Sequence, residues 1–152
     1  MNDMTPENDS KARLRLWIRL LRSSRTIENE LRDRLRTEFG ITLPRFDVMA
    51  ALHRQADGML MSELSRFLMV SNGNVTGIID RLVADGQVVR AQREGDRRAS
   101  IVKLTDKGRD DFERMAAAHE QWVDELFGSL SASEISSMTT LLQTFTEQRS
   151  AR

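Results

Sequence analysis

Four small polar side chains lie within six residues of one another at the start of a segment with helical apolar spacing: Ser71, Asn72, Asn74 and Thr76. Hydroxyl and amide groups at a helix N-terminus can donate and accept hydrogen bonds at base edges in the DNA major groove. The apolar side chains that follow would bury the opposite face of the same helix. This pattern predicts a helix that reads DNA.

A second group of chemically active residues is basic and follows about twenty residues later. Asp96, Arg97 and Arg98 come directly after Gly95, in a polar segment between two short β-type runs. A hairpin with arginines at its tip can enter a minor groove, and a neighbouring carboxylate can hold a guanidinium in a fixed direction. These three residues, with Arg81 and Arg93, complete the predicted DNA-contacting set.

Each of these features also has a simpler interpretation. Arginines in a hairpin turn are often only solvated, and Asn72 and Asn74 can act as local caps instead of base readers. Gly73 and Gly77 each cost roughly 1 kcal/mol in a helix interior relative to alanine. Either a backbone, of DNA or protein, approaches closely there, or the first two turns simply tolerate glycine.

The charge of the chain is unevenly distributed. Its 152 residues include 23 basic and 23 acidic side chains, so the formal net charge is zero, which alone argues against nucleic-acid binding. Residues 81–103, however, hold six basic and three acidic side chains, whereas residues 105–152 hold nine acidic and five basic ones. A locally positive DNA reader attached to an acidic remainder is consistent with both numbers.

The elements that would position these residues follow from periodicity and capping signals. Apolar spacing predicts a long helix from about Ser10 to Phe39, ended by Gly40. The next segments are a helix from near Pro44, a turn at 56–58, a helix over 62–68 and the reading helix over 71–85, which Gly86 ends. A hairpin of 88–89 with 101–104 follows. The last two elements are a helix capped by Thr105 and a helix that a capping box over 131–134 begins. Phe67 and Val83 are expected on buried helix faces.

Two helices followed by a hairpin, with helices on either side, are typical of a winged helix-turn-helix. The expected fold is therefore mainly α with a small β-hairpin wing: a winged helix-turn-helix core flanked by N- and C-terminal dimerisation helices. We expect a loose leader over 1–9, a helical dimerisation region over 10–40 and 105–150, and a DNA-binding region over 41–104, in one intertwined domain. The terminal helices need a partner because they carry unmatched apolar residues, namely Leu14, Trp17, Ile18, Met138, Leu141 and Phe145.

The segment LSRFLMVSNGNVTGIIDRLVADGQVVRAQREGDRRASIVKLTDKG, residues 64–108, resembles the MarR (multiple antibiotic resistance regulator) family. Its most specific part is Asp96-Arg97-Arg98 followed by Leu104-Thr105 and Gly108, and the likeness extends over about residues 10–148. The resemblance implies a homodimer joined by its first and last helices, a pseudo-palindromic operator and, usually, repression relieved by a small ligand. It also implies that residues 71, 72, 74 and 76 face bases and residues 96–98 form the wing tip. Gly77 departs from the larger polar or basic residue of many members, so some specificity would come from minor-groove shape.

The resemblance further implies an effector cleft between the dimer helices and the DNA-binding lobe. Arginines with aromatic side chains would suit an aromatic or amphipathic anion, such as an aromatic carboxylate or its coenzyme A thioester. Core packing for the apolar members and a solvated face for the arginines are the alternatives. The residues proposed for this cleft are Trp17, Arg19, Arg22, Phe46, Met49, His53 and Trp122.

Other classes of function have little support in the sequence. The chain has no cysteine, which excludes disulfides, thiolate zinc sites and thiol redox sensing, and its two histidines are far apart. No nucleophile elbow, phosphate-binding loop or His-Glu-x-x-His motif indicates an enzyme, and no cofactor or metal is expected. No apolar run is long enough to span a membrane, so a cytoplasmic location is expected. A winged helix that binds protein instead of DNA is the remaining alternative.

Overall fold

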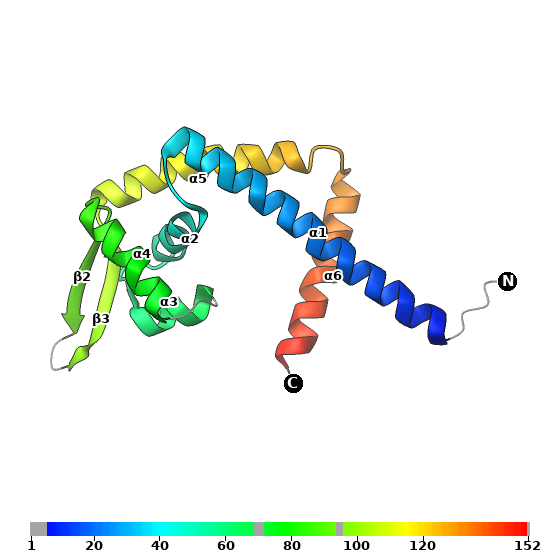
Figure 1. Cartoon of the computed structure of the whole chain (residues 1–152), viewed down its shortest axis with the longest axis horizontal. Helices are drawn as coiled ribbons and strands as arrows, with labels where there is room; N and C mark the ends of the chain where they lie inside the picture. The colour runs from blue at the N-terminus through cyan, green and yellow to red at the C-terminus, as the bar shows by residue number, and fades with distance from the viewer. Residues whose placement is uncertain (1–5, 69–71, 94–95, 152) are drawn as a thin grey trace. The chain divides into compact units, whose positions relative to one another are not determined.

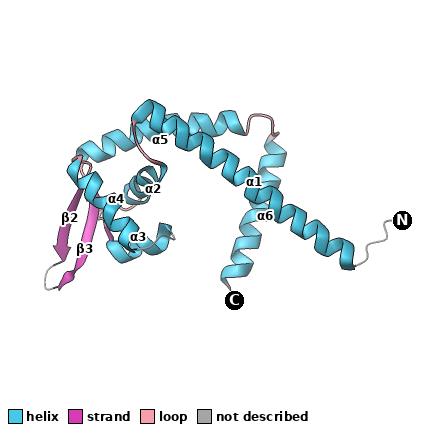
Figure 2. Cartoon of the chain, viewed as in Figure 1, coloured by secondary structure: helices cyan, strands magenta, loops and turns pink. Residues whose placement is uncertain are grey.

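The computed structural model describes residues 6–68, 72–93 and 96–151, and within them the side chains of 6, 7, 72, 93 and 96–98 are not described. Two compact units divide the chain, Met1–His119 and Glu120–Arg152. The elements are α1 (Pro6–Phe39), α2 (Leu43–His53), β1 (Met59–Leu60), α3 (Met61–Leu68), α4 (Asn72–Ala84), β2 (Val88–Arg93), β3 (Asp96–Leu104), α5 (Asp106–Leu126) and α6 (Ala132–Ser150). The expected mainly α fold with a hairpin wing is confirmed (Figures 1 and 2).

The helix boundaries follow from local chemistry. Helix α1 begins at Pro6, earlier than the expected leader over 1–9 allowed, and ends where Gly40 adopts a φ of 63°. Thr42 caps α2 by accepting a hydrogen bond from the Arg45 N–H, as hydroxyl side chains do at helix N-termini. Gly86, with a φ of 72°, follows α4, so the two predicted glycine stops are confirmed.

The core of the first unit lies among the end of α1, helices α2, α3 and α4, and the sheet. Its least exposed side chains are Leu35, Val48, Met49, Leu52, Leu64, Val75, Ile79, Leu82, Val88 and Val102. Two expectations were wrong, because Phe67 is 58% exposed and Val83 is 41% exposed. Phe67 comes three residues after the buried Leu64, and Val83 comes one residue after the buried Leu82. The buried face of each helix is therefore narrower than the apolar pattern predicted.

The sheet has three antiparallel strands in the order β1-β3-β2. Strands β2 and β3 form the wing, with Val88 opposite Leu104 and Arg93 opposite Asp96, and their register shifts between Gln92 and Arg93. Both strands are longer than the predicted apolar runs because the polar residues toward the tip also pair. Strand β1 was not expected from the sequence, and its Met59 pairs with Val102 of β3.

The second unit contains the end of α5 and helix α6. Ser131 and Glu134 form the predicted capping box, in which each side chain accepts a hydrogen bond from the other residue's backbone N–H. No residue of α6 is buried. Its apolar side chains are 44% to 70% exposed, namely Ile135, Met138, Leu141, Leu142 and Phe145. The boundary between the two units falls inside α5, and the expected division into dimerisation and DNA-binding regions stays a prediction. Across the described residues, no helix combines the length and the apolar character that a membrane crossing requires.

Candidate nucleic-acid interface

Helix α4 has one face that packs against the core and one face that is exposed. Val75, Ile79 and Leu82 are fully buried, so the helix is held to the core by one stripe. Asn74 lies on the exposed side and Thr76 is half-buried. Ser71 lies outside the described residues, and for Asn72 only the backbone, at the first position of α4, is described. The first two turns of α4 therefore present polar groups and bare backbone on their exposed side.

Among the described residues, packing does not require the two glycines of α4. A Cβ atom built on Gly73 or on Gly77 would have no neighbour within 4 Å in this part of the chain. Close approach by a described segment is therefore not the reason for these glycines. Close approach by DNA and simple tolerance are the two interpretations left.

A groove of about 620 Å³ runs along this open face of α4. It is lined by the end of α1, the start of α2 and the exposed side of α4, so residues far apart in sequence meet there. Four of its side chains are guanidinium groups, which suit phosphate oxygens. The lining residues are Arg32, Arg36, Thr42, Leu43, Pro44, Arg45, Gly73, Asn74, Gly77, Ile78 and Arg81.

An ion pair that could not be predicted from the sequence joins the wing to α4, the candidate reading helix. Arg90 of β2 donates to Asp80 of α4 at 3.2 Å. The predicted wing residues Arg93, Asp96, Arg97 and Arg98 lie in the paired strands β2 and β3, but their side chains lie outside what the structure describes. No periodic pattern in the sequence joins residues 80 and 90, because the link crosses from a helix to a strand.

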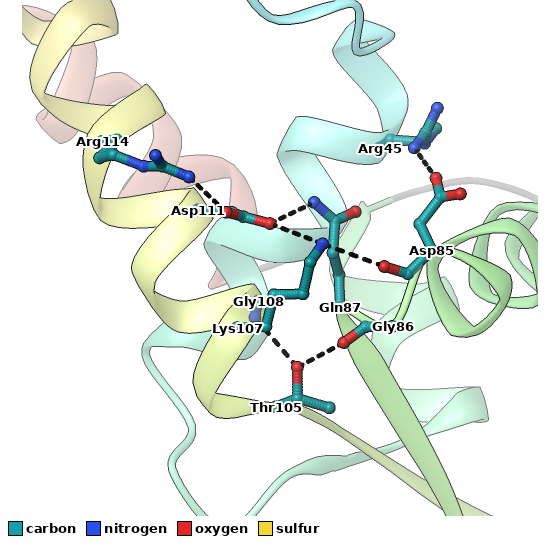
Figure 3. A network of polar contacts seen from close by, with 9 residues as sticks. All are labelled: Arg45, Asp85, Gly86, Gln87, Thr105, Lys107, Gly108, Asp111 and Arg114. Carbon is teal, nitrogen blue, oxygen red and sulfur yellow. Dashed lines mark hydrogen bonds and ion pairs between the residues drawn. The ribbon is translucent and has the colours of Figure 1, made fainter.

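A polar network at the junction of α4, β2 and α5, here called the junction network, fixes the reading helix and wing to α5. The Thr105 hydroxyl donates to the Gly86 carbonyl oxygen at 2.7 Å and accepts from the Gly108 N–H at 3.0 Å. The Thr105 N–H donates to the Gln87 carbonyl oxygen at 3.0 Å. The predicted cap at Thr105 is thus confirmed, and Figure 3 shows the members of the network: Arg45, Asp85, Gly86, Gln87, Thr105, Lys107, Gly108, Asp111 and Arg114.

Asp111 is the carboxylate at the centre of the hydrogen bonds between α5 and Gln87 in the junction network. Asp111 accepts hydrogen bonds from Gln87 at 3.0 Å and from Lys107 at 3.2 Å, and also from Arg114. Burial by itself would raise the pKa of Asp111, but these three hydrogen bonds outweigh it and hold the pKa below its ordinary value. Asp111 is therefore an ionised link between α5 and the start of β2.

This lowered pKa makes the link sensitive to acid. A carboxylate whose pKa is lower in the folded state adds stability above its unfolded pKa, and that stability is lost as the pH falls through the folded pKa. We expect Asp111→Asn to lose less stability than the wild type between pH 5.5 and pH 3, measured by urea unfolding. Asp110→Asn, which removes a neighbouring carboxylate of α5 outside the network, is the matched control. Equal losses for Asp111→Asn and the wild type would contradict the assignment.

The residues predicted to line an effector cleft lie in different surroundings. Trp17 is 57% exposed and Arg19 and Arg22 are exposed along α1, whereas Phe46 and Met49 belong to the core. Trp122 is buried in the second unit. This cleft stays a prediction.

The two histidines belong to an aromatic cluster instead of a metal site. His119 stacks on Phe46 with ring centroids 4.7 Å apart, and His53 lies against Phe112 at 4.9 Å. His53 also contacts Glu113 at 3.3 Å. Burial lowers the pKa of His119, which favours a neutral, packed ring. Within the described ranges, no three His, Cys, Asp or Glu side chains gather in a way that could hold a metal ion.

Comparisons with known proteins agree on one family. The MarR family model matches residues 39–99. The transcriptional activatory protein BadR of Rhodopseudomonas palustris is 33% identical over 132 residues, covering 84% of this chain and 75% of the relative. The multiple antibiotic resistance protein MarR of Escherichia coli is 33% identical over 120 residues, covering 76% and 83%.

Solved structures give the same result for the fold. A MarR family transcriptional regulator from Silicibacter pomeroyi has a TM-score of 0.79 and 34% identity, covering 93% of this chain and 98% of that one. A cysteine-to-serine mutant of E. coli MarR, in complex with operator DNA, has a TM-score of 0.74 and 27% identity, covering 95% and 99%.

Proposed function

Because this chain belongs to the MarR family of transcriptional regulators, we propose that it binds a pseudo-palindromic operator as a homodimer and represses transcription until a small ligand releases it. Like the other members of this family, the chain is a DNA-binding regulator and not an enzyme. Repression is the finer part of the proposal, since one relative is named an activatory protein. An aromatic acid or its coenzyme A thioester is the proposed releasing ligand.

The single observation that supports this function best is the two-sided character of α4. One face is anchored by fully buried Val75, Ile79 and Leu82, while the other offers Asn74 and two glycines with open space above them. A helix held in this way can insert its first turns into a major groove without unfolding. In a two-fold dimer, two such helices would enter successive major grooves roughly 34 to 36 Å apart, and the wings would contact the flanking minor grooves.

The dimer is supported by apolar surface that each unit leaves exposed. In the first unit, Leu14, Leu16 and Trp17 of α1 are 57% to 60% exposed. In the second unit, α6 has no buried residue. Exposed apolar stripes of this length mark protein–protein interfaces, and both fall on the helices expected to join the protomers.

The wing is tested by replacing both predicted tip arginines. We expect Arg97→Ala with Arg98→Ala to weaken binding at least about 30-fold, since arginine contacts to DNA are each worth about 1 to 3 kcal/mol and two of them sum to about 2 kcal/mol or more. The measurement is fluorescence anisotropy with DNA from upstream of the protein's own gene, at two salt concentrations. Phosphate contacts make affinity fall with salt.

The control for this experiment is Arg54→Ala, which removes an exposed arginine outside the predicted DNA-contacting set. It should bind DNA as the wild type does. Unchanged affinity in a folded Arg97/Arg98 double variant would overturn the wing assignment. If the wild type prefers no DNA at any salt concentration, the alternative that this winged helix binds protein would gain support.

A further inference from the structure

A polar cleft of about 440 Å³ lies within the first unit, beside the C-terminal end of α4, where the junction network meets the end of α1. Helices α2, α4 and α5 and the connection between α4 and β2 all contribute to it. Apart from Gly40, its lining is charged or polar except for Phe39, Ile41 and Met115. The polar lining residues are Arg45, Arg81, Asp85, Gln87, Lys107, Asp111 and Arg114. None of the seven residues predicted for an effector cleft is among them.

The cleft carries more positive than negative charge. Four cations face two carboxylates, so two positive charges are in excess. Asp85 serves both Arg45, at 2.6 Å, and Arg81, at 3.6 Å. Asp111 serves the other two cations, Lys107 and Arg114. One carboxylate shared between two cations leaves part of their hydrogen-bonding capacity for an anionic ligand.

Two atoms of residues that line this cleft are buried and lack hydrogen-bond partners among the described residues. They are Nε of Arg45, which can only donate a hydrogen bond, and Oε1 of Gln87, which can only accept one. A buried polar group without a partner costs about 1 to 3 kcal/mol, so unsatisfied atoms in a native cleft indicate a missing partner. A single molecule that satisfied both atoms would offer an acceptor to Arg45 and a donor to Gln87.

We propose that this cleft binds a small, hydroxylated dianion: a hydroxydicarboxylate or the phosphate monoester of a small alcohol. Two anionic charges match the two excess cations, and an anionic oxygen would accept from the Arg45 Nε–H. A hydroxyl group on the same molecule would donate to the Gln87 Oε1 atom. The mostly polar lining disfavours a bulky aromatic acid, so this site and its ligand class differ from the effector cleft proposed from the sequence.

Occupancy of the cleft would act on the reading helix, a consequence that rests on the proposed function. The Arg45–Asp85 ion pair joins α2 to the residue directly after α4. A dianion bound to Arg45 and Arg81 competes with Asp85 for both. It therefore favours conformations in which α4 is less firmly held to α2, and it lowers DNA affinity only as far as it prefers those conformations.

Isothermal titration calorimetry of the full chain tests the site without DNA. The probes are malate, succinate, glycerol 3-phosphate and inorganic phosphate. We expect malate or glycerol 3-phosphate to bind with a Kd below about 1 mM, the value that corresponds to about −4.1 kcal/mol. If a hydroxydicarboxylate is the right ligand class, succinate, which lacks the hydroxyl of malate, should bind at least fivefold more weakly than malate. If a phosphate ester is the right ligand class, inorganic phosphate should likewise bind at least fivefold more weakly than glycerol 3-phosphate.

Two variants separate the site from general charge effects. Arg114→Gln removes an exposed cation of the cleft, and Gln87→Met removes the unpartnered acceptor with little change of size. We expect each to weaken binding of the preferred probe about tenfold, while the exposed Arg54→Gln keeps wild-type affinity. No binding of any of the four probes overturns the proposal, and so does unchanged affinity in both cleft variants.

A DNA arm keeps this test apart from that of the proposed function. In anisotropy, the preferred probe should weaken DNA binding of the wild type, and the same effect on Arg114→Gln should need about tenfold more probe. A chain that binds DNA and none of the probes overturns the anion site and leaves the proposed function standing. A chain that binds malate or the ester but no DNA supports the site and overturns the proposed function.

Discussion

Replacing Gly108 by alanine should lower the free energy of unfolding by about 3 kcal/mol or more, at the upper end of what overpacking costs. A Cβ atom at this position would overlap the Gln87 carbonyl oxygen and lie 2.8 Å from the carbonyl carbon of Gln87. That carbonyl cannot move freely, because it accepts a hydrogen bond from the Thr105 N–H and directly precedes strand β2, in which Val88 pairs with Leu104. Relief of the overlap would therefore pull β2 away from α5.

Gly77→Ala is the matched control for this substitution. Both glycines lie inside helices, but a Cβ atom on Gly77 meets no atom of the described residues within 4 Å. Alanine is the better helix former by about 1 kcal/mol, so Gly77→Ala should be neutral or stabilising. Urea and thermal unfolding should separate the two variants by roughly 10 °C in Tm, given about 2 to 4 °C per kcal/mol for a chain of this size. If Gly108→Ala were as stable as Gly77→Ala, α5 and β2 would not be packed as described.

Local signals allowed most of the fold to be predicted from the sequence. A cap such as Ser131, or a stop such as Gly86, acts on backbone groups only a few residues away, so the residue type itself carries the information. The same is true of Thr105, whose hydroxyl accepts from an N–H three residues later. Its second bond, to the Gly86 carbonyl oxygen, spans nineteen residues and could not be predicted.

What the sequence could not supply were contacts between distant segments. Strand β1 has only two residues, too few for any periodicity, and it exists because Met59 pairs with Val102. The Arg45–Asp85 pair spans forty residues, and neither residue belongs to a recognisable motif. The junction network and its polar cleft were missed for this reason. By contrast, the candidate reading face of α4 could be proposed in advance, because its polar residues all lie within six positions of the sequence.

Burial was predicted correctly where a stripe was narrow and wrongly at its edges. Leu64 and Leu82 are fully buried, whereas Phe67 and Val83, at the margins of the same stripes, face solvent. Periodicity gives the direction of an apolar face but not its width, which depends on what packs against it. The exposed apolar side chains of α6 extend this lesson, because a strong apolar pattern there has no partner within its own unit.

Two acidic substitutions on α6 should therefore abolish the proposed dimer. Leu141 and Phe145 are 70% and 59% exposed in the single chain. In a dimer joined through this helix they would be buried, and glutamate at both positions would place unpaired charges in an apolar interface, at a cost of several kcal/mol. We expect Leu141→Glu with Phe145→Glu to be monomeric by size-exclusion chromatography with light scattering, at about 17.4 kDa instead of twice that mass.

The matched control carries the same charge on the other side of the same helix. Ser136 and Thr140 are exposed polar residues of α6, and helical spacing places them opposite the apolar stripe. Ser136→Glu with Thr140→Glu should therefore keep the dimer and its DNA affinity. The apolar-face variant should lose DNA affinity as well, since a monomer engages one half-site and gives up the gain from linking two. A dimeric Leu141/Phe145 variant would remove α6 from the interface, whereas monomers from both variants would show that charge alone, and not the apolar stripe, decides the association.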